Sequence, residues 1–218
     1  MKTPGIHRDR SVFRDDHGTA ILEFTLIAMI LFGLTFAVVD FSIAFWQANL
    51  ADKATYQGTR QAVQSDSVAP GVTAWSGVVD GGLDPGTPLD LSRLDAFTVH
   101  CQSGACACTG PGCGAIGDPG YDATAFNRIL TAVQMVDANG NALFSRATAA
   151  NVYVEYSHVG QGFAGRPGSD VVPLVSVGVQ GLVHPFFFMG MFGMTGLTIG
   201  DSLTTLPAED LWTAFPPS

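Results

Sequence analysis

The fold is decided by residues 18–64, which read GTAILEFTLIAMILFGLTFAVVDFSIAFWQANLADKATYQGTRQAVQ. Between Thr19 and Phe45 this stretch is apolar, and its only charged side chains are Glu23 and Asp40. As a helix these 27 residues extend about 40 Å, against a hydrocarbon core of roughly 30 Å in a bilayer. We therefore predict that they form a single transmembrane helix.

The helical pattern continues beyond the predicted bilayer segment. No proline occurs in residues 46–64, and apolar or small side chains recur there three or four residues apart. This spacing places them on one stripe of a helix: Trp46, Leu50, Ala51, Ala54, Gly58 and Ala62. We predict one continuous helix over residues 19–64, whose second part lays this stripe on its own domain or on adjacent subunits.

Residues 65–218 predict a small α+β domain. A second helix is expected over residues 121–136, because Asp122 is a suitable N-cap and apolar residues follow at helical spacing. Alternating or β-prone segments predict strands at residues 72–79, 96–101, 151–159, 170–183 and 195–206. We therefore expect a mostly antiparallel sheet with one further helix, packed on the distal half of the long helix in a pilin-like arrangement.

The apolar run HPFFFMGMFGM, residues 184–194, lies between the last two predicted strands. It is too short to cross a membrane as a helix. We interpret it as core or hairpin packing. The alternative is a surface patch that meets the membrane or a partner subunit.

Basic residues set the expected orientation of the membrane helix. Residues 1–18 form a polar leader with four Lys or Arg, whereas the nearest basic residues after the helix are Lys53 and Arg60. The positive-inside rule then places the N-terminus in the cytoplasm and the C-terminal domain in the periplasm. Residues 51–218 carry six Lys or Arg and fourteen Asp or Glu, a net charge of −8. We expect no nucleic-acid role for such an acidic domain.

All four cysteines lie in one loop, residues 101–113, at Cys101, Cys106, Cys108 and Cys113. In an oxidising compartment, clustered thiols indicate disulfides. Of the three possible pairings we favour the two that avoid the very tight Cys106–Cys108 ring. The spacing fits a zinc site poorly, although the adjacent His100 offers a further ligand. We predict no metal, no cofactor and no catalytic residues.

Gly18 and Glu23 frame a possible processing site. Gly18 ends the charged leader, and Glu23 is the fifth residue of the apolar helix. A carboxylate in hydrocarbon is costly and normally needs a partner. Cleavage after Gly18 would leave an α-amine on Thr19, with a pKa near 8, that can pair with Glu23 of an adjacent subunit. Alternatively, Glu23 reaches the membrane surface by itself. Asp40 is interpreted as a boundary residue at the far interface.

This combination resembles the processing site of type IV prepilins and pseudopilins. The wider stretch resembles the TadE-like proteins, TadE and TadF, of tight-adherence (Tad, or Flp) pilus systems. The resemblance rests on Glu23-Phe24, on Asp40-Phe41, and then on Ala54, Gly58 and Arg60. It extends to NVYVEYS, VPLVSVGVQGLVHP and TLPAED in the C-terminal half.

The resemblance implies a structural, non-enzymatic component of Tad pilus assembly in the bacterial inner membrane. A prepilin peptidase would cut it after Gly18. Its other partners would be the pilin, further pseudopilins, the inner-membrane assembly platform and the lipid bilayer; it would stay in the membrane or enter the pilus. One alternative is an unprocessed single-pass membrane protein with a periplasmic binding domain. A third is a metal-binding enzyme domain at the cysteine loop, which predicts bound metal and free thiols.

Overall fold

A computed structural model describes residues 16–194, 196–199, 201–208 and 211. The chain divides into two compact units. The first contains the N-terminal residues up to Ile43 together with Pro185–Gly196, and the second contains Ala44–His184 together with the residues from Leu197 onward. Most of the predicted leader lies outside the described residues.

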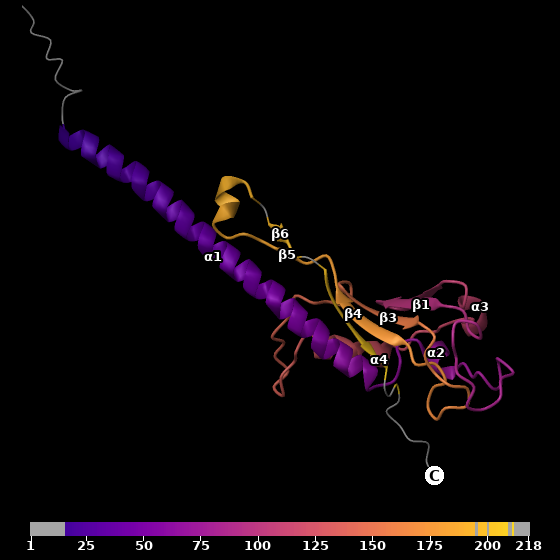
Figure 1. The fold of residues 1–218 in the computed structure, drawn as a ribbon. Helices are drawn as coiled ribbons and strands as arrows, with labels where there is room; N and C mark the ends of the chain where they lie inside the picture. The colour runs from indigo at the N-terminus through magenta and orange to yellow at the C-terminus, as the bar shows by residue number, and fades with distance from the viewer. Residues whose placement is uncertain (1–15, 195, 200, 209–210, 212–218) are drawn as a thin grey trace, which may run out of the picture. The chain divides into compact units, whose positions relative to one another are not determined.

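The longest element is helix α1, Asp16–Val63, which is continuous through 48 residues (Figure 1). It contains no proline, and its hydroxyl side chains bond back onto their own helix. The Oγ1 atom of Thr35 donates to the Leu31 carbonyl at 2.8 Å, and the Oγ atom of Ser42 donates to the Val38 carbonyl at 2.7 Å. These bonds satisfy the polar groups inside an apolar sequence. The predicted helix is therefore confirmed, with its start three residues earlier than expected.

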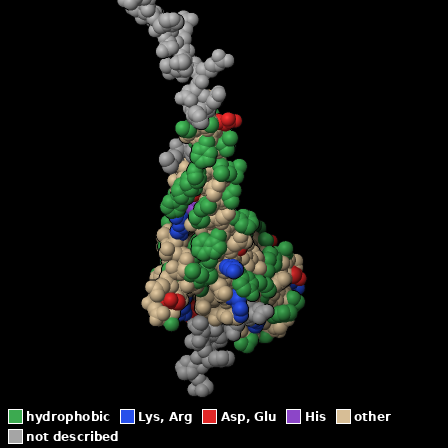
Figure 2. All heavy atoms as spheres, turned by 90° about the vertical axis from the view of Figure 1, so that its left-hand side faces the viewer, with side chains coloured by type: hydrophobic (Ala, Val, Ile, Leu, Met, Phe, Trp, Pro, Cys, Tyr) green, Lys and Arg blue, Asp and Glu red, His purple; other side chains and the backbone are tan. Residues whose placement is uncertain are grey.

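In the first unit, α1 presents an unburied apolar surface. No side chain between Thr19 and Val39 is buried, and large residues such as Leu22 and Met29 are about 70% exposed, at 73% and 70%. Figure 2 shows hydrophobic side chains gathered along the helix on the face turned to the viewer. Within the described residues, α1 is the one helix long and apolar enough to cross a membrane. An apolar surface of this size is consistent with a single membrane span.

The second unit is built on a five-stranded antiparallel sheet with the order β2-β1-β3-β4-β7. The central strand β3 places Val152, Val154 and Tyr156 on a fully buried face, as its alternation predicts. A separate pair, β5 with β6, forms a two-stranded ribbon. The strand bounds are β1 Phe97–Gln102, β2 Ala105–Thr109, β3 Val152–His158, β4 Leu174–Val179, β5 Val183–His184, β6 Leu197–Thr198 and β7 Ser202–Pro207.

The distal half of α1 and helix α4, Ala123–Val133, pack on the buried face of this sheet. Gly58 of α1 lies against Val133 of α4 and Val177 of β4, which shows where the three elements meet. Three short helices complete the described fold: α2 Pro70–Ala74, α3 Cys113–Ile116 and the 3-10 helix η1 Met189–Phe192. The predicted α+β architecture is confirmed.

Three predicted strands differ from the structure. Residues 72–79 are not a strand, because helix α2 and a turn use their backbone groups locally, as in the Asp80 N–H bond to the Ser76 carbonyl. The predicted strand over 170–183 divides into β4 and β5, since Gly181 turns the chain with φ of 68°. The predicted strand over 195–206 likewise divides into β6 and β7.

Candidate functional site

The N-terminal part of α1 carries the predicted processing and assembly residues. Gly18 and Thr19 lie within the helix, with Thr19 exposed. Glu23 is also exposed, and Phe24 beside it is 73% exposed. No described residue forms a hydrogen bond or an ion pair with Glu23. Within the described residues, this carboxylate is therefore exposed and has no partner.

Asp40 behaves differently from Glu23, although both are carboxylates in the apolar stretch. Asp40 is fully buried. Its Oδ1 atom accepts a hydrogen bond from the N–H of Phe187 at 3.2 Å, and its Oδ2 atom accepts from the N–H groups of Phe188 and Met189 at 2.9 and 2.8 Å. Asp40 thus holds residues 187–189 against α1, a role that its position near a predicted interface did not indicate.

Aromatic contacts reinforce this attachment. The ring of Phe188 stacks on Phe36 with centroids 4.3 Å apart, and Phe186 meets Phe41 edge to face at 5.4 Å. Residues 186–189 therefore pack on the first part of α1, and the three phenylalanines 186–188 are not part of the described core of the α+β domain. Phe41, one of the residues that carry the resemblance, therefore packs against the ring of Phe186.

The distal half of α1 uses the predicted stripe to enter its own domain. Leu50, Ala51, Ala54, Gly58 and Ala62 are all buried, whereas Trp46 is 57% exposed. A row of hydroxyls continues this contact to strand β7. The Oγ1 atom of Thr55 lies 3.0 Å from that of Thr204, and Thr59 donates to the Thr204 carbonyl at 3.1 Å. Gly58, one of the predicted motif residues, therefore packs inside the α+β domain, against Val133 and Val177.

Arg60 lies on the opposite, exposed side of α1. Its guanidinium is 6.0 Å from the ring centroid of Tyr56, a cation–π arrangement. Arg60 and Arg128 of α4 line one open groove, together with Gln57, Gln61, Gln64, Thr131, Ala132, Met135 and Val136. Among the described residues that line this groove none is acidic, and Arg128 is paired with Asp66, so Arg60 is the lining arginine without a carboxylate partner among them. The groove therefore suits a negatively charged or amide-rich partner surface.

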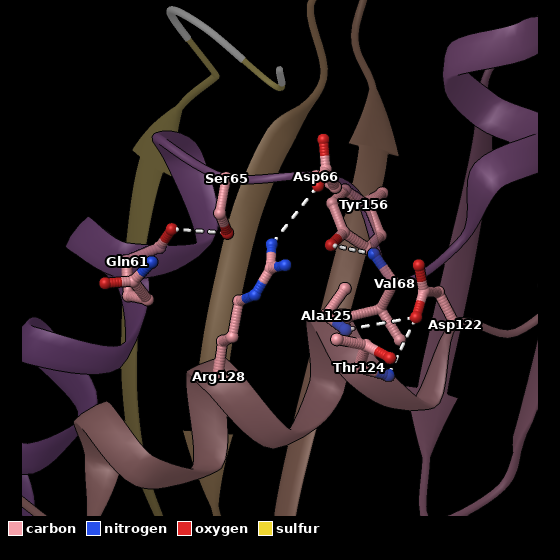
Figure 3. A network of polar contacts seen from close by, with 9 residues as sticks. All are labelled: Gln61, Ser65, Asp66, Val68, Asp122, Thr124, Ala125, Arg128 and Tyr156. Atoms are coloured by element: carbon pink, nitrogen blue, oxygen red, sulfur yellow. Dashed lines mark hydrogen bonds and ion pairs between the residues drawn. The ribbon is translucent and has the colours of Figure 1, made fainter. Parts of the chain in front are cut away.

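Polar contacts hold the chain leaving α1 against α4 and β3 (Figure 3). Arg128 forms an ion pair with Asp66 at 3.2 Å, and the buried Tyr156 hydroxyl accepts a hydrogen bond from the Val68 N–H at 3.0 Å. Burial raises the pKa of Tyr156, so the hydroxyl stays protonated. Asp122 caps α4, as predicted, by accepting from the N–H groups of Thr124 and Ala125 at 2.7 and 3.1 Å.

The cysteine loop forms two disulfides, Cys101–Cys106 and Cys108–Cys113. This is one of the two arrangements that the sequence left open. Cys101 and Cys106 face each other across the β1–β2 hairpin. The adjacent His100 bonds through Nδ1 to Glu155 at 3.0 Å. Within the described part of the chain, no three His, Cys, Asp or Glu side chains gather in a way that could hold a metal ion.

Together these features define a class of protein: a long helix with an exposed apolar first part, whose distal half is built into an α+β domain. The model of the TadE-like protein family matches residues 18–60. This segment is TadE-like, which confirms the family predicted from Glu23-Phe24, Asp40-Phe41, Gly58 and Arg60. The similarity noted in the C-terminal half lies outside the match. Neither the curated proteins nor the solved structures gave a match to the chain.

Proposed function

We propose that this protein is a pseudopilin-like structural component of a Tad, or Flp, pilus assembly machine, with no catalytic activity of its own. The observation that carries this proposal is the TadE-like match over residues 18–60. The matched segment coincides with the exposed apolar part of α1 and with its first turns inside the α+β domain. A helix of this kind can serve as membrane anchor and as packing surface in an assembly.

A prepilin peptidase is proposed to cleave the chain after Gly18. The new α-amine of Thr19 then lies four residues from Glu23 on the same helix. In a bilayer, an ammonium of one subunit and the exposed Glu23 carboxylate of its neighbour stabilise each other, because an isolated charge is costly in hydrocarbon and an opposite charge offsets that cost. The exposure of Glu23 supports this role.

The proposed location is the bacterial inner membrane, with residues 1–18 in the cytoplasm, residues 19–45 in the bilayer and the rest in the periplasm. Residues 46–64 continue the helix into the periplasmic domain of residues 65–218. The disulfides of the cysteine loop support an oxidising compartment for that domain. The proposed partners are the pilin, other pseudopilins and the inner-membrane assembly platform. The groove lined by Arg60 offers an acidic neighbour a docking surface.

The two alternative functions predict different observations. An unprocessed single-pass membrane protein with a binding domain would keep its leader in cells that contain the peptidase. A metal-binding enzyme domain at the cysteine loop needs thiolate ligands, whereas all four thiols are paired in the structure. The paired thiols favour the structural role over the metal site.

The mass of the intact chain from cells that contain the prepilin peptidase tests the proposal. We expect a chain that begins at Thr19, and a Gly18→Leu variant that keeps its leader. Gly33→Leu is the matched control, because Gly33 has open space around its Cα and should leave cleavage unchanged. A native chain that still begins at residue 1 or 2 contradicts processing.

Glu23 is tested separately by counting assembled pili. Glu23→Ala and the isosteric Glu23→Gln remove the charge, so both should reduce assembly while the protein still reaches the membrane. Normal processing and normal pilus numbers in both variants would rule out the role proposed for this carboxylate.

A further inference from the structure

The apolar segment 185–194 lies in the connection between strands β5 and β6. Its sequence, PFFFMGMFGM, contains no charged residue. Phe187 is 68% exposed and Met194 is 49% exposed. Because this segment belongs to the same compact unit as the first part of α1, its exposed side chains add to the apolar surface of that helix.

The attachment of this segment to α1 is specific. Three consecutive N–H groups, those of residues 187–189, converge on the buried carboxylate of Asp40 at 2.8 to 3.2 Å. Phe188 stacks on Phe36 one helical turn away from Asp40. The segment is therefore held along the helix axis between these two positions.

The height of this contact along α1 places it near one edge of the bilayer. With Thr19 at one edge of the hydrocarbon, Phe36 lies about 26 Å along the helix and Asp40 about 32 Å. The hydrocarbon core is roughly 30 Å thick. Phe36 and its partner Phe188 then lie a few Å inside the far edge, and Asp40 lies at that edge.

Hydrogen bonds to Asp40 lower the cost of placing a segment without regular secondary structure at this depth in the bilayer. Backbone N–H groups in lipid need protein acceptors, since water is absent there. A carboxylate at the same depth needs donors, because its desolvation is costly. Asp40 and residues 187–189 satisfy each other, and charge-assisted hydrogen bonds of this kind are stronger than neutral ones.

We propose that residues 185–194 form a membrane wedge, which inserts Phe187 and its neighbours beside α1 into the leaflet at the C-terminal end of the membrane span, with Asp40 as its internal cap. The partner is the lipid bilayer. The wedge gives the protein a second membrane contact that adjoins the lipid-facing surface of α1. The inference depends on the membrane span of α1 and not on cleavage after Gly18 or on a role in pili.

Tryptophan reporters in the full chain test the wedge. Trp46, Trp75 and Trp212 are first replaced by Phe, and single tryptophans are then introduced as Phe187→Trp, Leu31→Trp and Val79→Trp. The proteins are reconstituted into phosphatidylcholine and phosphatidylglycerol vesicles with or without dibrominated acyl chains. Leu31 lies on the exposed apolar part of α1, and Val79 is an 82% exposed apolar residue of the other unit.

We expect the bromine to quench the Phe187→Trp signal to an extent similar to that of Leu31→Trp, with little loss for Val79→Trp. Quenching at position 187 no greater than at position 79 overturns the wedge. If acrylamide reaches that tryptophan, the segment lies in water; if acrylamide does not, protein covers it. An unquenched Leu31→Trp overturns the membrane span itself, and the wedge with it.

Substitution of Asp40 tests the cap. Asp40→Leu leaves three N–H groups without an acceptor, so lipid quenching at position 187 should fall towards the Val79→Trp level while quenching at position 31 persists. Asp40→Asn keeps one oxygen and should give an intermediate loss. Asp52→Asn is the matched control, because Asp52 accepts a hydrogen bond from Ser202 inside the α+β domain. Unchanged quenching in Asp40→Leu contradicts the cap.

Discussion

Gly58 has no Cβ atom, and this allows helix α1 to pack closely against its own domain. A Cβ atom at this position would overlap Cγ2 of Val133 and lie 3.1 Å from Cγ1 of Val177. Glycine therefore permits the close approach of α1 to both α4 and β4. Interiors packed this densely respond to the addition of even one methyl group.

Gly58→Ala should lower the stability of the protein. Overpacking of a core costs about 1–3 kcal/mol, and the better helix propensity of alanine offsets at most about 1 kcal/mol of this. Urea unfolding of the full chain in detergent, followed through the buried Trp75, measures the difference. Gly114→Ala in α3 is the control, since open space surrounds Gly114. Equal midpoints for the two variants would contradict the packing role.

His158 makes the stability of the domain depend on pH. It is only 1% exposed and stacks on Phe97. Burial lowers the pKa of His158, the backbone of Leu94 opposes this shift weakly, and within the described chain no hydrogen bond of regular geometry satisfies either ring nitrogen. The folded protein thus binds fewer protons than the unfolded chain below the ordinary histidine pKa of about 6.5.

The sign of the effect follows from this difference in proton binding. Stability should be constant above the unfolded pKa and should fall as pH drops below about 6.5 towards the lowered folded pKa. This loss of stability is measured by melting temperatures between pH 7.5 and 5.5, compared with those of the His158→Phe variant. The wild-type melting temperature should decrease more than that of the variant. Parallel curves would show that His158 does not cause the decrease.

At the scale of elements, α1 has two different environments along one unbroken helix. Its first part exposes apolar side chains on every side, whereas its distal half is amphipathic and buries a stripe from Leu50 to Ala62. The chain that follows α1 is bonded back to the domain by the Val68 N–H and the Tyr156 hydroxyl. This bond links the end of the helix to the central strand β3.

Tyr156→Phe should loosen that link. It leaves the Val68 N–H buried without an acceptor, which costs about 1–3 kcal/mol. Hydrogen exchange of the Val68 amide should accelerate, and the free energy of unfolding should fall. Tyr153→Phe serves as the control on the same strand, because the Tyr153 hydroxyl bonds to no described residue. Equal losses in both variants would assign the effect to the ring environment and not to the hydrogen bond.

At the scale of the whole molecule, the two units differ in what stabilises them. Every fully buried residue of the hydrophobic core belongs to the second unit, from Leu50 to Ala208. The described residues of the first unit have aromatic stacking and the Asp40 hydrogen bonds, but form no core of this kind. The α+β domain should therefore fold without the first part of α1.

A chain that begins at Ala44 should unfold cooperatively with a melting temperature within about 4 °C of the full chain, which corresponds to about 1 kcal/mol at this size. A second version carries Phe186→Ser, Phe187→Ser and Phe188→Ser, since these side chains would otherwise promote aggregation. Calorimetry compares both versions with the full chain. Loss of a cooperative transition in the version with the three serines would show that the domain needs the first unit.

Local patterns predicted much of this protein. The length and hydropathy of residues 19–45 indicate a membrane helix, the alternation around Val154 places its faces correctly in β3, and Asp122 caps the helix that it was expected to begin. These features depend on periodicity and on neighbours a few residues away, so they can be read from one sequence. The short segments 72–79 and 195–206 were misjudged in type or extent, because a few apolar residues do not distinguish a strand from a turn.

Pairings between distant residues were decided only by the tertiary structure. The sequence itself determined that the four cysteines are clustered, and the register of the β1–β2 hairpin selected the pairing of Cys101 with Cys106. Asp40 looked like a boundary residue, yet its donors lie 147 to 149 residues further along the chain. No local pattern encodes such a contact, since it arises only when packing brings two separate segments to the same place.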